Sequence, residues 1–164
     1  MIFKTNKHNT DLYNTLLHLS RNMYFYNQIN LKDTFETRIY LMFMHFSIIL
    51  IVYKLKKTDF PQYSYDNLFT CVENNLRELG FGDVAVNKKM KELNKIFYDI
   101  LLKISPVSKK VKINKNLILK YFDYINKSND KKYDLFDRYL TNFYHFCFEL
   151  HPKNMIKDAL NFRI

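Results

Sequence analysis

Apolar residues recur at intervals of three and four along most of the chain, which is the period of an α-helix. Only two glycines and three prolines interrupt this pattern. The pattern predicts one all-α domain over residues 1–164, a bundle of about six to seven helices around a hydrophobic central helix. The main breaks are expected at Phe60-Pro61, Gly80, Ser105-Pro106, Ser128-Asn129-Asp130 and His151-Pro152.

The most apolar stretch runs from Ile39 to Tyr53, where only His45 and Ser47 interrupt apolar or aromatic residues. A helix that is apolar on all sides must be covered by protein or by lipid. Its 15 residues would span roughly 22 Å, less than the ~30 Å hydrocarbon layer of a bilayer. We therefore expect a central core helix, in which His45 is a hydrogen-bonded core histidine.

Two features predict how the chain enters this helix. A first helix is expected from about Asp11, followed by an aromatic stretch from Met23 to Tyr26. The sequence Asp33-Thr34-Phe35-Glu36 then has the form of a capping box, with Asp33 as the N-cap of the central helix. The core side of the first helix is expected to carry Leu12, Leu16 and Leu19.

Two amphipathic helices are predicted after the central one. The first runs from about Asp66 to Gly80. After a connector at 81–86, Asn87 is the expected N-cap of the second, Lys88 to Ile104. The first is expected to bury Leu68, Val72, Leu76 and Leu79, and the second Met90, Leu93, Phe97, Ile100, Leu101 and Ile104.

The last third of the chain predicts a basic connector and three helices. Lys109 to Lys115 has little apolar content, and we expect a mobile loop there. A helix through Ile118, Tyr121, Phe122 and Ile125 follows, and Met155 to Phe162 is expected to form a short terminal helix. Between them a long aromatic helix should bury Phe136, Tyr139, Leu140, Phe143, Cys147 and Leu150.

The formal net charge of +10 predicts that the helical bundle has a basic surface. A basic surface attracts nucleic acid and anionic membranes. The abundance of Lys, Asn, Ile, Phe and Tyr is also what an AT-rich genome produces, so part of the charge is compositional. The distant pair Cys71 and Cys147 fits a reducing compartment, and no apolar signal segment stands at the N-terminus, so we expect a cytoplasmic protein.

Candidate catalytic or metal-binding residues are sparse. The chain has neither HExxH, paired CxxC nor GxSxG. Gly80 to Ala85 matches GxGxxA formally but follows a helical run, so a helix-ending glycine and a turn are expected instead of a dinucleotide site. An enzymatic hypothesis would rest on His45, His145 and Glu149 alone. We expect no enzyme, no metal and no cofactor.

One block of the sequence resembles a known family. It runs through Leu76-Arg77-Glu78-Leu79-Gly80-Phe81-Gly82-Asp83, Val86, Lys88-Lys89-Met90-Lys91 and Phe97-Tyr98. This block is similar to the signature of the ubiquinol-cytochrome c chaperone family, and the resemblance extends over about residues 11–104. Departures occur at Thr37 and Asp99, where glycine is expected, at Ile100, where arginine is expected, and at Asn87, where proline is frequent.

The resemblance implies a non-enzymatic assembly factor that binds newly made cytochrome b and promotes biogenesis of the respiratory bc complex. It also implies contact with the ribosome, a small partner subunit and, peripherally, the inner membrane of a bacterium, with a mitochondrial location second and no DNA partner. The alternative is a basic RNA- or ribosome-binding module without a specific client. The expected partner-binding residues are Arg77, Asp83, Lys88, Lys89, Lys91 and Lys95.

Overall fold

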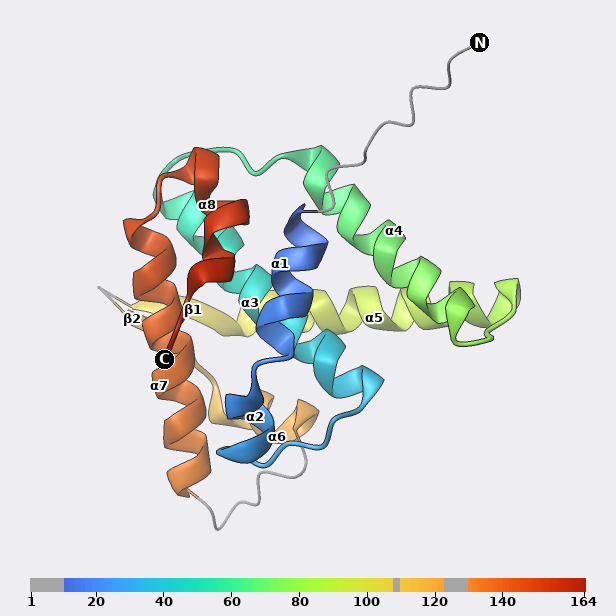
Figure 1. Ribbon diagram of the computed structural model, residues 1–164, viewed down its shortest axis with the longest axis horizontal. Coiled ribbons are helices and arrows are strands. Elements are labelled where there is room, and N and C mark those ends of the chain that lie inside the picture. The colour runs from blue at the N-terminus through green and yellow to red at the C-terminus, as the bar shows by residue number, and fades with distance from the viewer. Residues whose placement is uncertain (1–10, 108–109, 123–129) are drawn as a thin grey trace.

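The computed structural model describes residues 11–107, 110–122 and 130–164 (Figure 1). These residues form eight α-helices and one short hairpin, which confirms the all-α class. The helix beyond the expected number is the five-residue α2, in the aromatic stretch. The elements are α1 Asp11–Ser20, α2 Met23–Asn27, α3 Phe35–Leu55, α4 Gln62–Glu78, α5 Asp83–Lys103, β1 Ile104–Val107, β2 Lys110–Ile113, α6 Lys115–Tyr121, α7 Asp130–Glu149, α8 Pro152–Asp158 and the 3-10 turn Ala159–Asn161.

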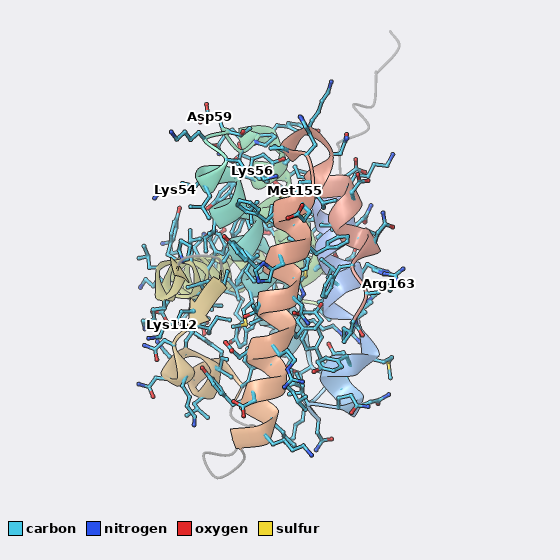
Figure 2. All side chains as sticks on the ribbon, turned by 90° about the vertical axis from the view of Figure 1, so that its left-hand side faces the viewer. Lys54, Lys56, Asp59, Lys112, Met155 and Arg163 are labelled. Atoms are coloured by element: carbon cyan, nitrogen blue, oxygen red, sulfur yellow. The ribbon has the colours of Figure 1, made fainter. Side chains whose placement is uncertain are left out.

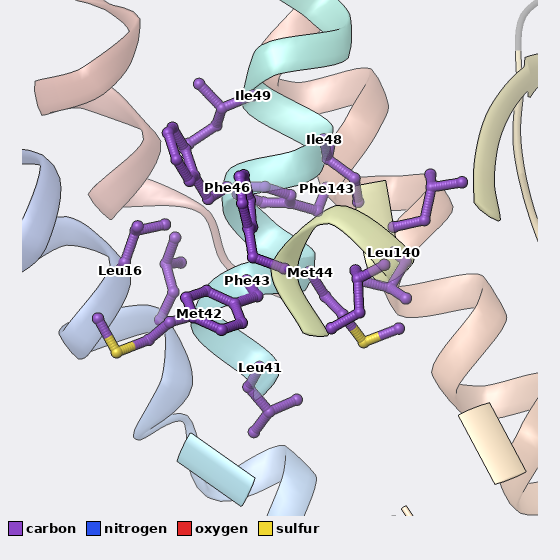
Figure 3. Close-up of a cluster of buried hydrophobic side chains, with 14 of the residues drawn as sticks. Leu16, Leu41, Met42, Phe43, Met44, Phe46, Ile48, Ile49, Leu140 and Phe143 are labelled. Atoms are coloured by element: carbon purple, nitrogen blue, oxygen red, sulfur yellow. The ribbon is translucent and has the colours of Figure 1, made fainter. Parts of the chain in front are cut away.

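The central helix of the fold is α3, as the apolar pattern predicts. It packs against α1, α5, α7, α8 and β1, and Figure 3 shows Leu16 of α1 on one side of it and Leu140 and Phe143 of α7 on the other. Residues 41–49 of α3 are buried without exception, on every side of the helix. The apolar side chains of neighbouring amphipathic helices therefore take the place that lipid would otherwise have.

Length does not separate a core helix from a membrane span here. The whole of α3 has 21 residues, or about 31 Å, so it is long and apolar enough to cross a bilayer. The 22 Å apolar stretch is therefore only part of a longer helix. What distinguishes α3 from a membrane span is its burial by protein. In its most apolar segment, 72% of the residues are buried inside the protein.

The N-cap of α3 is Thr34 and not Asp33. The Thr34 hydroxyl oxygen accepts a hydrogen bond from the backbone N–H of Thr37 at 3.2 Å. Asp33 instead forms a two-pronged ion pair with Arg38, whose Nε and Nη2 lie 2.6 and 2.8 Å from its carboxylate oxygens. This pair draws the carboxylate away from the helix end, so the neighbouring threonine caps it.

Both helices of the middle block begin earlier than predicted. Helix α4 starts at Gln62, directly after Pro61, whose φ of −60° is already compatible with a helix start. Helix α5 starts at Asp83, because Gly82 adopts the extended conformation of an N-cap. Asn87 is therefore an exposed residue inside the second turn of α5, and the expected connector at 81–86 is mostly helix.

The expected mobile loop contains a strand. β1 and β2 pair antiparallel, with Ile104 opposite Ile113 and Pro106 opposite Val111. Val111 and Ile113 are buried while Lys112 between them is exposed, so this segment has the alternation of a half-buried strand. Ile104, expected to end the preceding helix, begins β1.

Asp99 holds α6 against α5. Its carboxylate accepts hydrogen bonds from Lys103, at 2.6 Å, from the Tyr121 hydroxyl, and from Lys120, at 3.0 Å. These donors, Lys103 first, keep the pKa of the Asp99 carboxyl well below its ordinary value. The departure from the family pattern at Asp99 therefore anchors a helix of this chain.

The C-terminal helices follow the predicted pattern. The expected stripe of α7 is buried except for Leu150, which is half-buried and lies just past the helix end. The terminal helix starts at Pro152, where the His151 ring nitrogen Nδ1 accepts a hydrogen bond from the Lys153 backbone. Of the helix expected through Ile118 and Ile125, the structure shows α6, and Ile125 lies outside the described residues.

His45 is a satisfied core histidine, as predicted. Its Nδ1 hydrogen bonds to the carbonyl oxygen of Leu41 at 2.7 Å, and its Nε2 lies 2.9 Å from the Tyr139 hydroxyl. Since the carbonyl can only accept, Nδ1 carries the proton and Nε2 accepts from Tyr139. Phe25 and Phe143 pack edge-on against the ring. Burial lowers the pKa of His45 to about 4, so the ring is neutral.

The pKa of His45 predicts a pH-dependent stability. Between its ordinary pKa of 6.5 and about 4, the unfolded chain binds a proton at His45 that the folded protein does not bind. The free energy of unfolding should therefore fall as the pH falls through this window. Urea unfolding at pH 7 and pH 5 should show the wild type losing about 2 kcal/mol more than His45→Gln. Equal losses would contradict a neutral buried histidine.

Candidate partner-binding surface

The corner between α4 and α5 is a sharp turn that projects away from α7 and α8 (Figure 1). Gly80 has a φ of +96°, which glycine adopts freely. Its N–H bonds to the Arg77 carbonyl at 2.9 Å, and the N–H of Phe81 bonds to the Leu76 carbonyl at 3.2 Å. These two bonds form a Schellman motif, so the glycine acts as the predicted helix stop.

Large apolar side chains are exposed at this corner. Leu79 is 57% exposed, Phe81 43% and Val84 85%. The expectation that Leu79 continues the buried face of α4 is wrong, because α4 ends at Glu78 and Leu79 already belongs to the turn. Adjacent exposed apolar side chains on one corner are a feature typical of a binding surface.

An ion pair joins the two helices across the corner. Arg77, in the last turn of α4, lies 3.2 Å from Glu73 and, through Nε, 3.6 Å from the carboxylate of Asp83. Asp83 is the first residue of α5, where a negative charge also favours the helix dipole. The pair is solvent-exposed and adds little stability.

The lysines of α5 continue this surface. Lys88, Lys91 and Lys95 are exposed, and none of them pairs with a carboxylate among the described residues. Tyr98 extends the same face, and Val84 begins it. We call the five residues the α5 face; their spacing of four and three keeps them on one side of the helix: Val84, Lys88, Lys91, Lys95 and Tyr98.

Lys89, which was expected to bind a partner, and Lys112 of the basic connector lie away from this face. Lys89 is about 100° round the helix from Lys88, is half-buried and lies 3.7 Å from Glu92. Lys112 is exposed on β2, at the opposite end of α5 from the corner, and Lys109 lies outside the described residues. The described part of the basic connector therefore lies apart from the α5 face.

The three residues of the enzymatic hypothesis do not converge. His45 is buried against Tyr139, whereas His145 and Glu149 are exposed on α7. Burial raises the pKa of the Cys147 thiol between them, which makes it a poor nucleophile. Among the described residues, no group of three or more His, Cys, Asp and Glu side chains is placed to hold a metal ion.

Comparison with known proteins supports one family. The family model of the ubiquinol-cytochrome C chaperones matches residues 27–106. The matched segment begins at the end of α2 and reaches β1, so it contains α3, α4 and α5 entire. The resemblance suggested by the block from Leu76 to Tyr98 is confirmed over this segment. No curated protein and no solved structure matches the chain.

The geometry of the corner predicts opposite effects at its two glycines. Gly80→Ala places a Cβ at positive φ and should reduce the free energy of unfolding by about 1 kcal/mol, although nothing crowds the site. Gly82→Ser supplies a capping hydroxyl at an extended N-cap and should be neutral or stabilising. Thermal and urea unfolding of the two variants measure both effects. Equal destabilisation of both would contradict the described turn.

Proposed function

Because residues 27–106 match the ubiquinol-cytochrome C chaperone family, we propose that this protein binds newly made cytochrome b and promotes assembly of the respiratory bc complex. The match supports an assembly role for that complex. That cytochrome b is the client is a further step of the proposal. The family is one of chaperones, which act by binding and not by catalysis.

The observation that carries the proposal is where the matched segment lies in the fold. It forms the central helix together with the two helices that build the exposed corner and the α5 face. Leu79, Phe81 and Val84 offer apolar contacts to a client, and three lysines follow beside them on α5. Such a surface suits a hydrophobic chain that has not yet entered the bilayer.

The charge of the protein fits the setting in which such a client is made. Membrane proteins emerge between ribosomal RNA and the anionic surface of a membrane, and a protein of net charge +10 is attracted to both. The proposal therefore places the protein in the cytoplasm, peripherally at the inner membrane. It includes the ribosome and a small partner subunit as further contacts.

The alternative function is a basic module that binds RNA or ribosomes without a specific client. The three exposed lysines of the α5 face favour it. Proteins that hold single-stranded nucleic acid usually also place aromatic side chains among the charges as stacking platforms. On the α5 face Tyr98 alone is aromatic, while the neighbouring Phe97 is buried. The assembly role explains more of the surface.

The proposed function predicts that cytochrome b co-purifies with the protein from the native cell in mild detergent. The variant Lys88→Glu/Lys91→Glu/Lys95→Glu should lower the recovered cytochrome b about tenfold, because it reverses the charge of the α5 face at which the client is proposed to bind. Since all three side chains are exposed, the melting temperature should stay within about 2 °C of the wild type.

The matched control is Lys131→Glu/Lys153→Glu/Lys157→Glu, which makes the same change of charge at exposed positions of α7 and α8. It should retain the client. A deletion strain with normal cytochrome b and normal bc-complex activity would overturn the proposal. Steeply salt-dependent RNA binding without client selectivity would establish the alternative.

A further inference from the structure

A second surface lies at the other end of α5, where the C-terminal turns of α3 and α5 meet β1. The three elements enclose an open groove of about 590 Å³. Its walls are mainly apolar, and two lysines of the α3 end stand on its border. We call it the α3–α5 groove; its apolar walls include Leu50, Ile51, Leu55, Leu101, Leu102 and Pro106, and the lysines are Lys54 and Lys57.

The walls of the groove include leucines that face water. Leu55 is 44% exposed and Leu102 is 78% exposed, although both belong to helices whose other faces are packed into the core. The packing of α3 and α5 explains the buried side of each helix but not these two side chains. Exposed leucines on the border of an apolar hollow are what a helix-binding groove presents before its ligand arrives.

The backbone at Lys57 is held in a conformation that costs stability. Lys57 has a φ of 53°, in the left-handed region. It follows the C-cap of α3, and the bonds Lys57 N–H to Lys54 carbonyl and Thr58 N–H to Tyr53 carbonyl, each 3.0 Å, form a second Schellman motif. Glycine suits this position best, as Gly80 does at the end of α4. The chain places a lysine there instead, at the border of the groove.

The charge around the groove is positive. Neither Lys54 nor Lys57 pairs with a carboxylate among the described residues, and both are exposed. Figure 2 shows Lys54 on the same edge of the molecule as Lys112, with the end of α5 between them. An occupant with carboxylates beside its apolar side chains would complement this border.

We propose that the α3–α5 groove docks an amphipathic helix of a partner protein, with large apolar side chains on one face and acidic residues flanking them. A concave groove of this size receives side chains that project from a helix ridge, whereas a bilayer presents no ridge to fill it. Lys57 keeps its strained backbone because its ammonium group pairs with a carboxylate of that helix. The inference does not depend on which client the α5 face holds.

A synthetic peptide and the full-length protein test this proposal. The probe is an amphipathic peptide of about 18 residues, with leucines along one face and glutamates on both sides of them. Titration followed by fluorescence anisotropy should show binding, with amide NMR shifts confined to the ends of α3 and α5 and to β1. The same peptide with lysines in place of the glutamates should bind at least tenfold more weakly.

Two variants separate binding from stability. Lys57→Gly should weaken the peptide about threefold while the melting temperature stays the same or rises by up to about 3 °C, because glycine relieves the left-handed backbone. A lysine with only a structural role would not combine weaker peptide binding with an unchanged or higher melting temperature. Leu102→Gln, at an exposed helical position, should weaken the peptide at least tenfold without unfolding the protein.

The matched control is Lys153→Gly, at an exposed position of α8, which should leave the affinity unchanged. Equal binding of the acidic and the basic peptide would overturn the inference. So would unchanged affinity in Leu102→Gln. Binding of the protein to vesicles of phosphatidylcholine and phosphatidylglycerol that depends on Leu102, with no binding of the acidic peptide, would overturn it in favour of a membrane contact. None of these outcomes bears on whether cytochrome b co-purifies.

Discussion

The fold depends on covering α3 on every side. A helix without a polar face has no orientation in which it can meet water, so each neighbour must bring an apolar face to it. Helices α1, α5 and α7 do so, and α8 and β1 close the remaining sides. His45 and Ser47 are polar side chains inside this cover. The hydrogen bonds of His45 to Leu41 and Tyr139, and of the Ser47 hydroxyl to the Phe43 carbonyl, compensate for their burial. The surface of the protein is then made of the outer faces of the covering helices.

Much of this arrangement could be predicted from the sequence, because helical periodicity reports which face of a helix is buried. The stripe of α7, most of the stripe of α5 and the role of His45 follow from it, although Met90 and Leu101 of α5 are only half-buried. The predicted helix starts were wrong where a contact between nearby residues overrides the sequence rule for helix caps. Arg38 takes Asp33 away from the helix cap, and the N-cap of α5 is Gly82, five residues before the expected Asn87. The β2 strand was missed, although Val111 and Ile113 alternate with lysines, because four residues give a weak signal.

The two proposed binding surfaces were only partly predictable. Lysine spacing indicated Lys88, Lys91 and Lys95, and helix geometry places them on one face. The apolar corner around Val84 and the groove bordered by Leu55 and Leu102 could not be foreseen, since each brings together residues that belong to different helix ends. Helix α5 links these features: its inner side covers α3, and its outer side carries one of the two proposed contact surfaces towards either end. If both proposals hold, the same helix serves stability and binding.

The central claim is that protein, and not lipid, covers α3. Hydrogen–deuterium exchange on the protein purified without detergent tests it directly, because exchange reports how each segment opens to solvent. The account predicts a monodisperse sample in which the backbone amides of Phe35–Leu55 exchange among the slowest of the chain, through global unfolding. A sample that stays dispersed only in detergent, or α3 amides that exchange faster than those of α7, would contradict it.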